Sequence, residues 1–190
     1  MNSNLKANLV PNLFNRYVRV TMAYPALRVA NELLQLHGDV SHMKLQKLLY
    51  YANGWWLAME GQPLLNENPQ VWRYGPVFRW LYSSLSRFGH ADIGKPVPPG
   101  PFGPQNLTLE GEQGADNVRN LLSWIWAEHG QKTAIQLSDE THAPGTPWRK
   151  IAEEHNFRVP TNTEIPPQLD WEYFASLAQV RGFSPQPLKA

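Results

Sequence analysis

Residues 44–61 read KLQKLLYYANGWWLAMEG, and this stretch decides the fold. Between Leu48 and Met59 only Asn53 carries a strongly polar side chain, so a helix here is apolar on every side. Such a helix needs other helices around it to remove its surface from water. We therefore predict a mainly α fold, a compact helical bundle around a buried central helix at about 42–60.

A membrane span is the rival interpretation of the same run. Spanning a bilayer needs about 20 nearly uncharged residues. The run here is shorter, contains Asn53 and Gly54, and follows Lys44 and Lys47. We expect no membrane segment.

The composition suits one domain with a single aromatic-rich core, since the 190 residues include eight Trp. The net charge of +1 gives no basic field of the kind that binds a row of phosphates, so nucleic acid is not favoured as a partner. The absence of Cys excludes disulfides and thiolate chemistry, and it fits a reducing compartment such as the cytoplasm.

We expect the domain to span residues 22–182. The segment 1–21 has no acid and no long apolar run, so we predict a disordered extension, with an organelle targeting peptide as the weaker alternative and Met22 as an alternative start. Residues 94–104, GKPVPPGPFGP, include eight Gly or Pro in eleven and predict a surface loop. Residues 183–190 are expected to form a loose tail.

Apolar residues at helical spacing predict further helices, and Gly38 and Gly61 are expected to end the first and the central one. Ser41, Thr133 and Thr146 are predicted to cap helix starts. Trp124 lies off the apolar stripe of its helix and is a candidate exposed aromatic. The predicted surrounding helices cover about 23–37, 76–88, 115–129, 133–141, 147–154 and 168–181.

A short β-hairpin is predicted at about 64–74. Residues 71–74, VWRY, alternate in a way typical of a strand, and we expect Leu64 and Leu65 to pair back with them across a turn. Gly75 and Pro76 are then expected to open the 76–88 helix, because proline is well tolerated at the first helical position.

No motif indicates catalysis. The six His include no pair at the four-residue spacing of a helical metal site, and the GxSxG, P-loop and GxGxxG patterns are absent. Ser138, Asp139 and His142 resemble a hydrolytic triad, but adjacent residues on a helix point about 100° apart, so local capping explains them better. We predict no enzyme, no cofactor and no metal site.

The chain resembles the Panacea antitoxin family, whose members include SocA-like proteolytic adaptors and phage-associated proteins. The resemblance runs from about Ala23 to Phe174, and the run at 44–52 followed by WRYGPV at 72–77 is its most specific part. It implies an intracellular helical protein that neutralises a cognate protein toxin by binding it, and in the SocA-like case delivers the toxin to a AAA+ protease. The residues that carry it are KLQKLLYYA at 44–52, Gly54-Trp55, GQPL at 61–64, WRYGPV at 72–77, His142, Pro147-Trp148, Ile165, Tyr173 and Phe174.

Large aromatic residues and arginines are the side chains that most often anchor protein interfaces. For Trp55 and Trp72 a core role is the stronger interpretation, whereas the charge of Arg79 favours contact with a partner. A DNA-binding regulator using Arg73, Arg79 and Arg87 is the alternative function, and an unrecognised enzyme is the second alternative. The candidate partner-binding residues are Trp55, Trp72, Arg73, Tyr74, Arg79, Tyr82 and Trp148.

Overall fold

The computed structural model of the chain describes residues 23–99 and 106–189. Its helices are α2 (Ala26–His37), α3 (His42–Glu60), α4 (Arg79–Leu85), α5 (Ala115–His129), α6 (Ala134–Thr141), α7 (Pro147–Glu154) and α8 (Pro167–Val180). A 3-10 turn at Ser86–Phe88 extends α4. The strands β1 (Val40–Ser41) and β4 (Asp92–Ile93) form one antiparallel pair, and β2 (Gln70–Trp72) and β3 (Gly75–Val77) form another. The fold is mainly α, as predicted.

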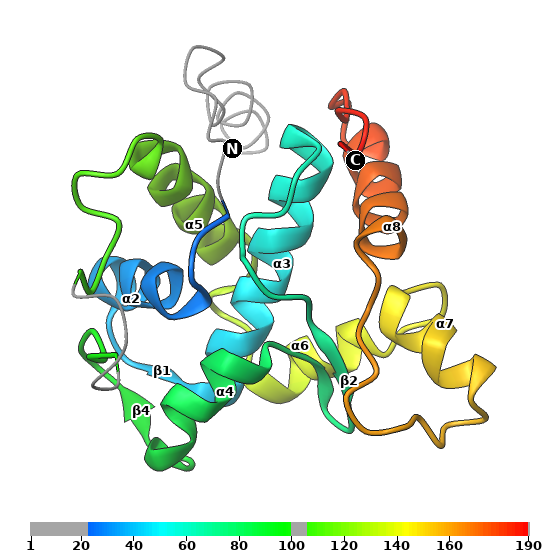
Figure 1. The fold of residues 1–190 in the computed structure, drawn as a ribbon, viewed down its shortest axis with the longest axis horizontal. Coiled ribbons are helices and arrows are strands. Elements are labelled where there is room, and N and C mark those ends of the chain that lie inside the picture. The colour runs from blue at the N-terminus through cyan, green and yellow to red at the C-terminus, as the bar shows by residue number, and fades with distance from the viewer. Residues whose placement is uncertain (1–22, 100–105, 190) are drawn as a thin grey trace.

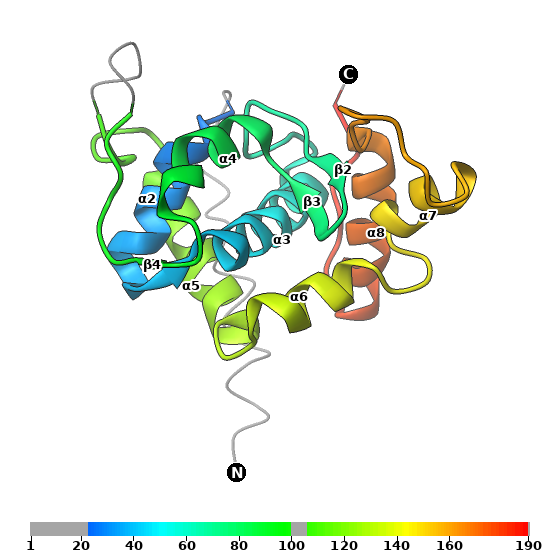
Figure 2. The same cartoon turned by 90° about the horizontal axis from the view of Figure 1, so that it is seen from below.

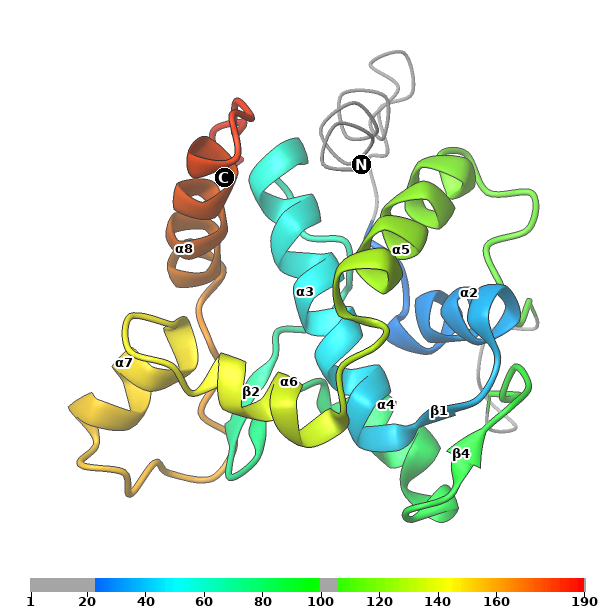
Figure 3. The same ribbon diagram turned by 180° about the vertical axis from the view of Figure 1, so that it is seen from behind.

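Helix α3 runs through the middle of the molecule, with α2 and α5 on one side and α8 on the other (Figures 1 and 3). Fifteen of its 19 residues are buried. At Gly54 the backbone of α3 approaches α8 so closely that an added Cβ would lie 2.0 Å from the ring of Phe174. The prediction of a buried central helix is confirmed.

The predicted helix boundaries of α3 are also confirmed. The Ser41 hydroxyl accepts a hydrogen bond from the backbone N–H of Lys44, and Gly61 adopts the left-handed conformation at φ 68°. Thr133 and Gln136 form a reciprocal capping box at the start of α6. At the start of α7 the Thr146 hydroxyl accepts a hydrogen bond from the N–H of Arg149, and Pro147 is the first helical residue.

The hairpin differs from its prediction in both position and partner. Strand β2 pairs with β3 across the turn residues Arg73 and Tyr74, so the hairpin spans 70–77 and not 64–74. Leu64 and Leu65 do not pair back. Their backbone N–H groups donate to Asn53 Oδ1, each at 3.0 Å, and Leu65 forms a bridge with Tyr24.

The predicted helix at 76–88 starts three residues late. Gly75 has φ 98°, which suits the exit from a tight turn, and Pro76 continues as strand opposite Val71. The backbone N–H of Phe78 donates to Gln46 Oε1 at 2.9 Å, so the chain is held extended up to that residue. Helix α4 begins only at Arg79.

The expected exposure of Trp124 is not observed. Trp124 is only 9% exposed, because its ring packs edge-on against Trp55 with centroids 5.0 Å apart. Within residues 183–189 the tail is held to α3: the N–H of Gln186 donates to the carbonyl of Ala58 at 2.9 Å, and that of Lys189 to Gly61 at 2.7 Å. These bonds use carbonyls that the end of a helix leaves free.

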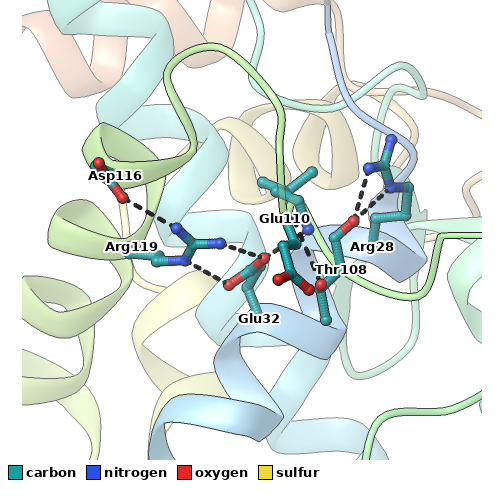
Figure 4. Close-up of polar contacts among 7 residues, drawn as sticks. Arg28, Glu32, Thr108, Glu110, Asp116 and Arg119 are labelled. Carbon is teal, nitrogen blue, oxygen red and sulfur yellow. Dashed lines mark hydrogen bonds and ion pairs between the residues drawn. The ribbon is translucent and has the colours of Figure 1, made fainter.

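The Pro/Gly-rich loop predicted at 94–104 is irregular in its described part, 94–99. The side-chain amide of Asn31 binds both the N–H and the carbonyl of Val97, and also donates to the carbonyl of Leu107. Figure 4 shows the adjoining contacts, in which the buried Glu32 carboxylate accepts from Leu109 N–H and from Arg119. Helix α2 therefore anchors the chain on both sides of the loop.

The extension predicted at 1–21 and the rest of that loop lie outside the described residues. None of the helices in the described segments is both long enough and apolar enough to cross a membrane.

Candidate functional site

The β2–β3 hairpin is held by side chains from α3, α6 and α7, which bind its backbone carbonyls one after another. Figure 2 shows β2 and β3 against α3, with α6 and α7 alongside. The donors and acceptors are Trp148 Nε1 to Trp72 O at 2.8 Å, Ser138 Oγ to Tyr74 O at 3.0 Å and Lys47 Nζ to Pro76 O at 2.9 Å, with His142 Nε2 3.2 Å from Arg73 O. The turn is thus fixed from three directions.

Lys47 reaches the hairpin from inside the fold. It is 1% exposed, and burial lowers the pKa of its amine to about 7 because the charged form is poorly solvated there. A Cβ at Gly75 would lie 2.9 Å from Lys47 Nζ and 2.4 Å from Thr141 Oγ1. Glycine is therefore required at position 75 for space as well as for its φ.

Gln46 continues this row of contacts beyond the strand. Its side-chain amide accepts from the N–H of Phe78 and donates to the Phe78 carbonyl at 3.2 Å, as a neighbouring strand would. Together with Asn53, which binds Leu64 and Leu65, the polar residues of α3 hold segment 64–78. The same residues that interrupt the apolar face of α3 thus position the hairpin.

The junction of α6 and α7 supplies the clamp on the other side. The ring of His142 packs against that of Trp148 with centroids 3.8 Å apart, and its Nδ1 lies beside the carbonyl of Ser138. The Thr146 hydroxyl donates to the carbonyl of Thr141 at 2.8 Å, which fixes the angle between the two helices. Ser138 and His142 thus belong to a structural clamp.

The clamped turn carries two exposed side chains, Arg73 and Tyr74. Tyr74 is 61% exposed, and the Arg73 guanidinium lies 5.5 Å from its ring. Beside the turn, Tyr82 of α4 packs on Trp72 with centroids 4.8 Å apart. Aromatic and cationic side chains are therefore displayed on a backbone that is already ordered.

Six of the seven candidate residues lie around the hairpin, and we call this set the hairpin face: Trp72, Arg73, Tyr74, Arg79, Tyr82 and Trp148. Arg79 lies at the start of α4 and donates to Asn162 Oδ1 at 3.1 Å, in the segment that covers the outer edge of β2. Trp148 is 8% exposed and supports the face through its hydrogen bond to the carbonyl of Trp72.

The seventh candidate, Trp55, lies elsewhere. It is 3% exposed and packs among Trp124, Phe174 and Phe183, with the Arg181 guanidinium 5.0 Å from its ring. It contributes to the junction of α3, α5 and α8.

Sequence reasoning did not predict that Gln46, Lys47, Ser138 and His142 hold the hairpin and the segment after it. For Gln46 and Lys47 the available signal was a polar side chain within the apolar helix α3, because a buried polar group needs a hydrogen-bond partner. Within residues 23–99 and 106–189, no group of three His, Asp or Glu side chains is placed to hold a metal ion.

The structure defines a class of protein: a mainly α fold, built on a buried helix, that presents a clamped hairpin at its surface. Residues 45–149, more than half of the chain, match the family described as "Antitoxin SocA-like, Panacea domain", and the chain belongs to this family. The matched segment contains α3 from Leu45 onward, the hairpin and the clamp residues Ser138, His142 and Trp148. It thus includes the residues whose resemblance to the family was most specific.

A curated relative supports the same assignment. The chain is 31% identical to "Antitoxin SocA" of Caulobacter vibrioides (strain NA1000 / CB15N) over 132 residues, which cover 67% of this chain and 70% of that protein. No solved structure matches the chain at a significant level.

Proposed function

We propose that this protein is an antitoxin that neutralises a cognate protein toxin in the cytoplasm by binding it directly, and that the hairpin face is the contact surface. Membership of the antitoxin family supports the existence of a toxin partner. The observation that carries the choice of surface is the row of hydrogen bonds that fixes the carbonyls of Trp72, Tyr74 and Pro76.

A fixed backbone matters because ordering a loop at the moment of binding reduces affinity. The turn at Arg73 and Tyr74 is ordered before any partner arrives, since side chains from three helices hold it. Tyrosine and arginine are also common interface anchors, as they bury large area with few rotatable bonds or donate several hydrogen bonds. These properties favour a binding role without catalysis.

A DNA-binding role has weaker support. The net charge is +1, and neutralising several phosphates would require a concentrated basic surface. A filter-binding measurement at increasing salt separates the two, because DNA binding would weaken steeply with salt concentration.

Co-expression with the neighbouring reading frame tests the proposal. We expect that frame to arrest growth when expressed alone, and this chain to restore growth and to co-purify with its product. The variant Tyr74→Ala together with Arg73→Ala should lose both effects while its thermal melt is unchanged, since both side chains are exposed. Restored growth without any stable complex would contradict direct binding.

The half-life of the toxin then tests the adaptor role that SocA-like proteins suggest. An adaptor should shorten the half-life of the toxin in cells that contain an ATP-dependent protease and leave it unchanged in cells that lack the protease. Simple masking should leave the half-life unchanged or longer in both.

A further inference from the structure

A cavity of about 280 Å³ opens beside the hairpin, between the end of β2 and helix α7. The residues that line it are 71–73, Trp148, Ala152, Phe157 and Val159. Small-molecule pockets are usually about 300–1,000 Å³. This cavity therefore has room for one large side chain and little more.

The backbone beyond α7 holds Phe157, which lines the cavity, in an unusual conformation. Asn156 and Phe157 have φ of 49° and 59°, values that are uncommon outside glycine and rarer still for a bulky aromatic residue. The N–H of Phe157 donates to Ala152 O at 2.6 Å and that of Asn156 to Glu153 O at 2.9 Å, the paired bonds of a Schellman motif.

This motif explains the contact of Phe157 with Ala152 but not the exposure of the ring. Phe157 is 57% exposed, although the motif normally brings such a residue against the helix. A strained position with an exposed aromatic ring is the kind of feature that gathers at binding sites.

The charged side chains around the cavity indicate which charge a bound partner should present there. Arg73 lines the cavity, is exposed, and forms no ion pair within the described part of the chain. A second guanidinium, that of Arg149, lies 4.9 Å from the Phe157 ring and is already paired with Glu153 at 2.6 Å. Arg73 is thus available to form an ion pair with a carboxylate of a binding partner.

Strand addition to β2 is not the mode of contact. Its outer edge is taken up by residues 163–165, since Val71 N–H donates to Thr163 O at 2.9 Å and Ile165 N–H to Pro69 O at 2.7 Å. The carbonyl of Trp72 is occupied by Trp148. Side chains, not backbone, must make the contact here.

We propose that this cavity receives one apolar or aromatic side chain of the toxin, from a surface segment whose adjacent carboxylate pairs with Arg73. The inference rests on the proposed function and names the part of the hairpin face where the toxin is anchored. A buried side chain of that kind, surrounded by polar contacts, is typical of an interface hot spot.

Binding of the purified neighbouring toxin to the full chain, measured by calorimetry, tests the inference. Phe157→Asn removes the ring and keeps a residue that tolerates positive φ, and Arg73→Glu reverses the charge. Each should weaken binding by about 30-fold, the loss typical of a hot-spot residue. Val180→Asn and Arg87→Glu make matched changes at exposed positions outside the cavity and should stay within about threefold of the unaltered chain.

A charge exchange makes the test sharper. One Asp→Lys or Glu→Lys variant of the toxin should recover binding to Arg73→Glu and lose binding to the unaltered chain. If Phe157→Asn and Arg73→Glu both bind like the unaltered chain, the cavity is not the anchor site although toxin binding stands. If the unaltered chain itself does not bind the toxin, both proposals fall.

Discussion

The indole nitrogen of Trp148 donates to the backbone carbonyl of Trp72 at 2.8 Å, between residues 76 positions apart in the sequence. This contact joins α7 to the end of β2, where the turn carrying Arg73 and Tyr74 begins. The bond is partly buried, and it helps to fix the position of the turn. It links the packing of the core to the display of the hairpin face.

Replacing Trp148 by Phe should loosen the hairpin. The change keeps an aromatic ring but removes the donor, and the loss of a typical hydrogen bond costs about 0.5–1.5 kcal/mol. Urea unfolding should show that loss, and toxin affinity should fall as the turn becomes mobile. Trp80→Phe is the control, because Trp80 is 73% exposed and its change should stay within about 0.5 kcal/mol.

Trp56→Ala tests the burial of α3. Trp56 is 1% exposed, and emptying a buried aromatic site costs about 3–5 kcal/mol. A thermal or urea melt measures this loss directly. A change below about 1 kcal/mol would contradict the packing around α3.

Gly54→Ala should destabilise the fold even though alanine is the better helix former by about 1 kcal/mol. The added methyl group would collide with the ring of Phe174, which is fully buried, so the ring or the helices must shift. We expect a net loss of about 1–3 kcal/mol, typical of overpacking. Combining it with Phe174→Leu should recover part of the loss, whereas simple additivity would show that the two sites do not touch.

Asp170 should make stability fall as pH rises from about 4 to 7. Burial raises its pKa from the ordinary 3.8 to about 7, so between these values the folded state holds a proton that the unfolded state has released. Asp170→Asn cannot ionise and still accepts from the Tyr50 hydroxyl, which now donates to Asp170 at 2.7 Å. The variant should match the unaltered protein near pH 4 and exceed it at pH 8 in urea unfolding.

Lys47 should make the stability of the fold rise with pH above about pH 7. Its folded pKa of about 7 lies below the ordinary 10.5, so the unfolded state holds the proton more tightly and stability rises from about pH 7 to 10.5. Lys47→Met should remove this rise. Near pH 10.5 it should lower stability, since it leaves the Pro76 carbonyl without its donor, whereas at pH 7 and below this loss is offset because no charged amine is buried. An unchanged pH profile would show that the amine is solvated.

Some features depend on local patterns and were predicted from sequence. The apolar run from Leu48 to Met59 predicted a buried helix, and Ser41 and Gly61 marked its limits. These predictions hold because helix periodicity and capping involve residues within a few positions of one another. The resemblance to the Panacea family was carried by the same local runs.

The predictions were wrong where a contact with a distant segment overrides the local preference of a residue. Trp124 was expected at the surface from its helix alone, but Trp55 covers it. Pro76 fits a helix start by local rules, but Lys47 and Gln46 hold the chain extended through Phe78. A local sequence pattern does not show which side chains from distant segments will pack against it or form hydrogen bonds with it.

By itself, the sequence determined a helical protein with a buried central rod, and its motifs pointed to an antitoxin family. Only the tertiary structure decided that the hairpin runs from 70 to 77, that Trp148, Ser138 and Lys47 hold it, and that Arg73 and Phe157 face one cavity. The physical reason is that helix formation is governed by neighbours along the chain, whereas a binding face is assembled from hydrogen bonds and packing between segments far apart in it.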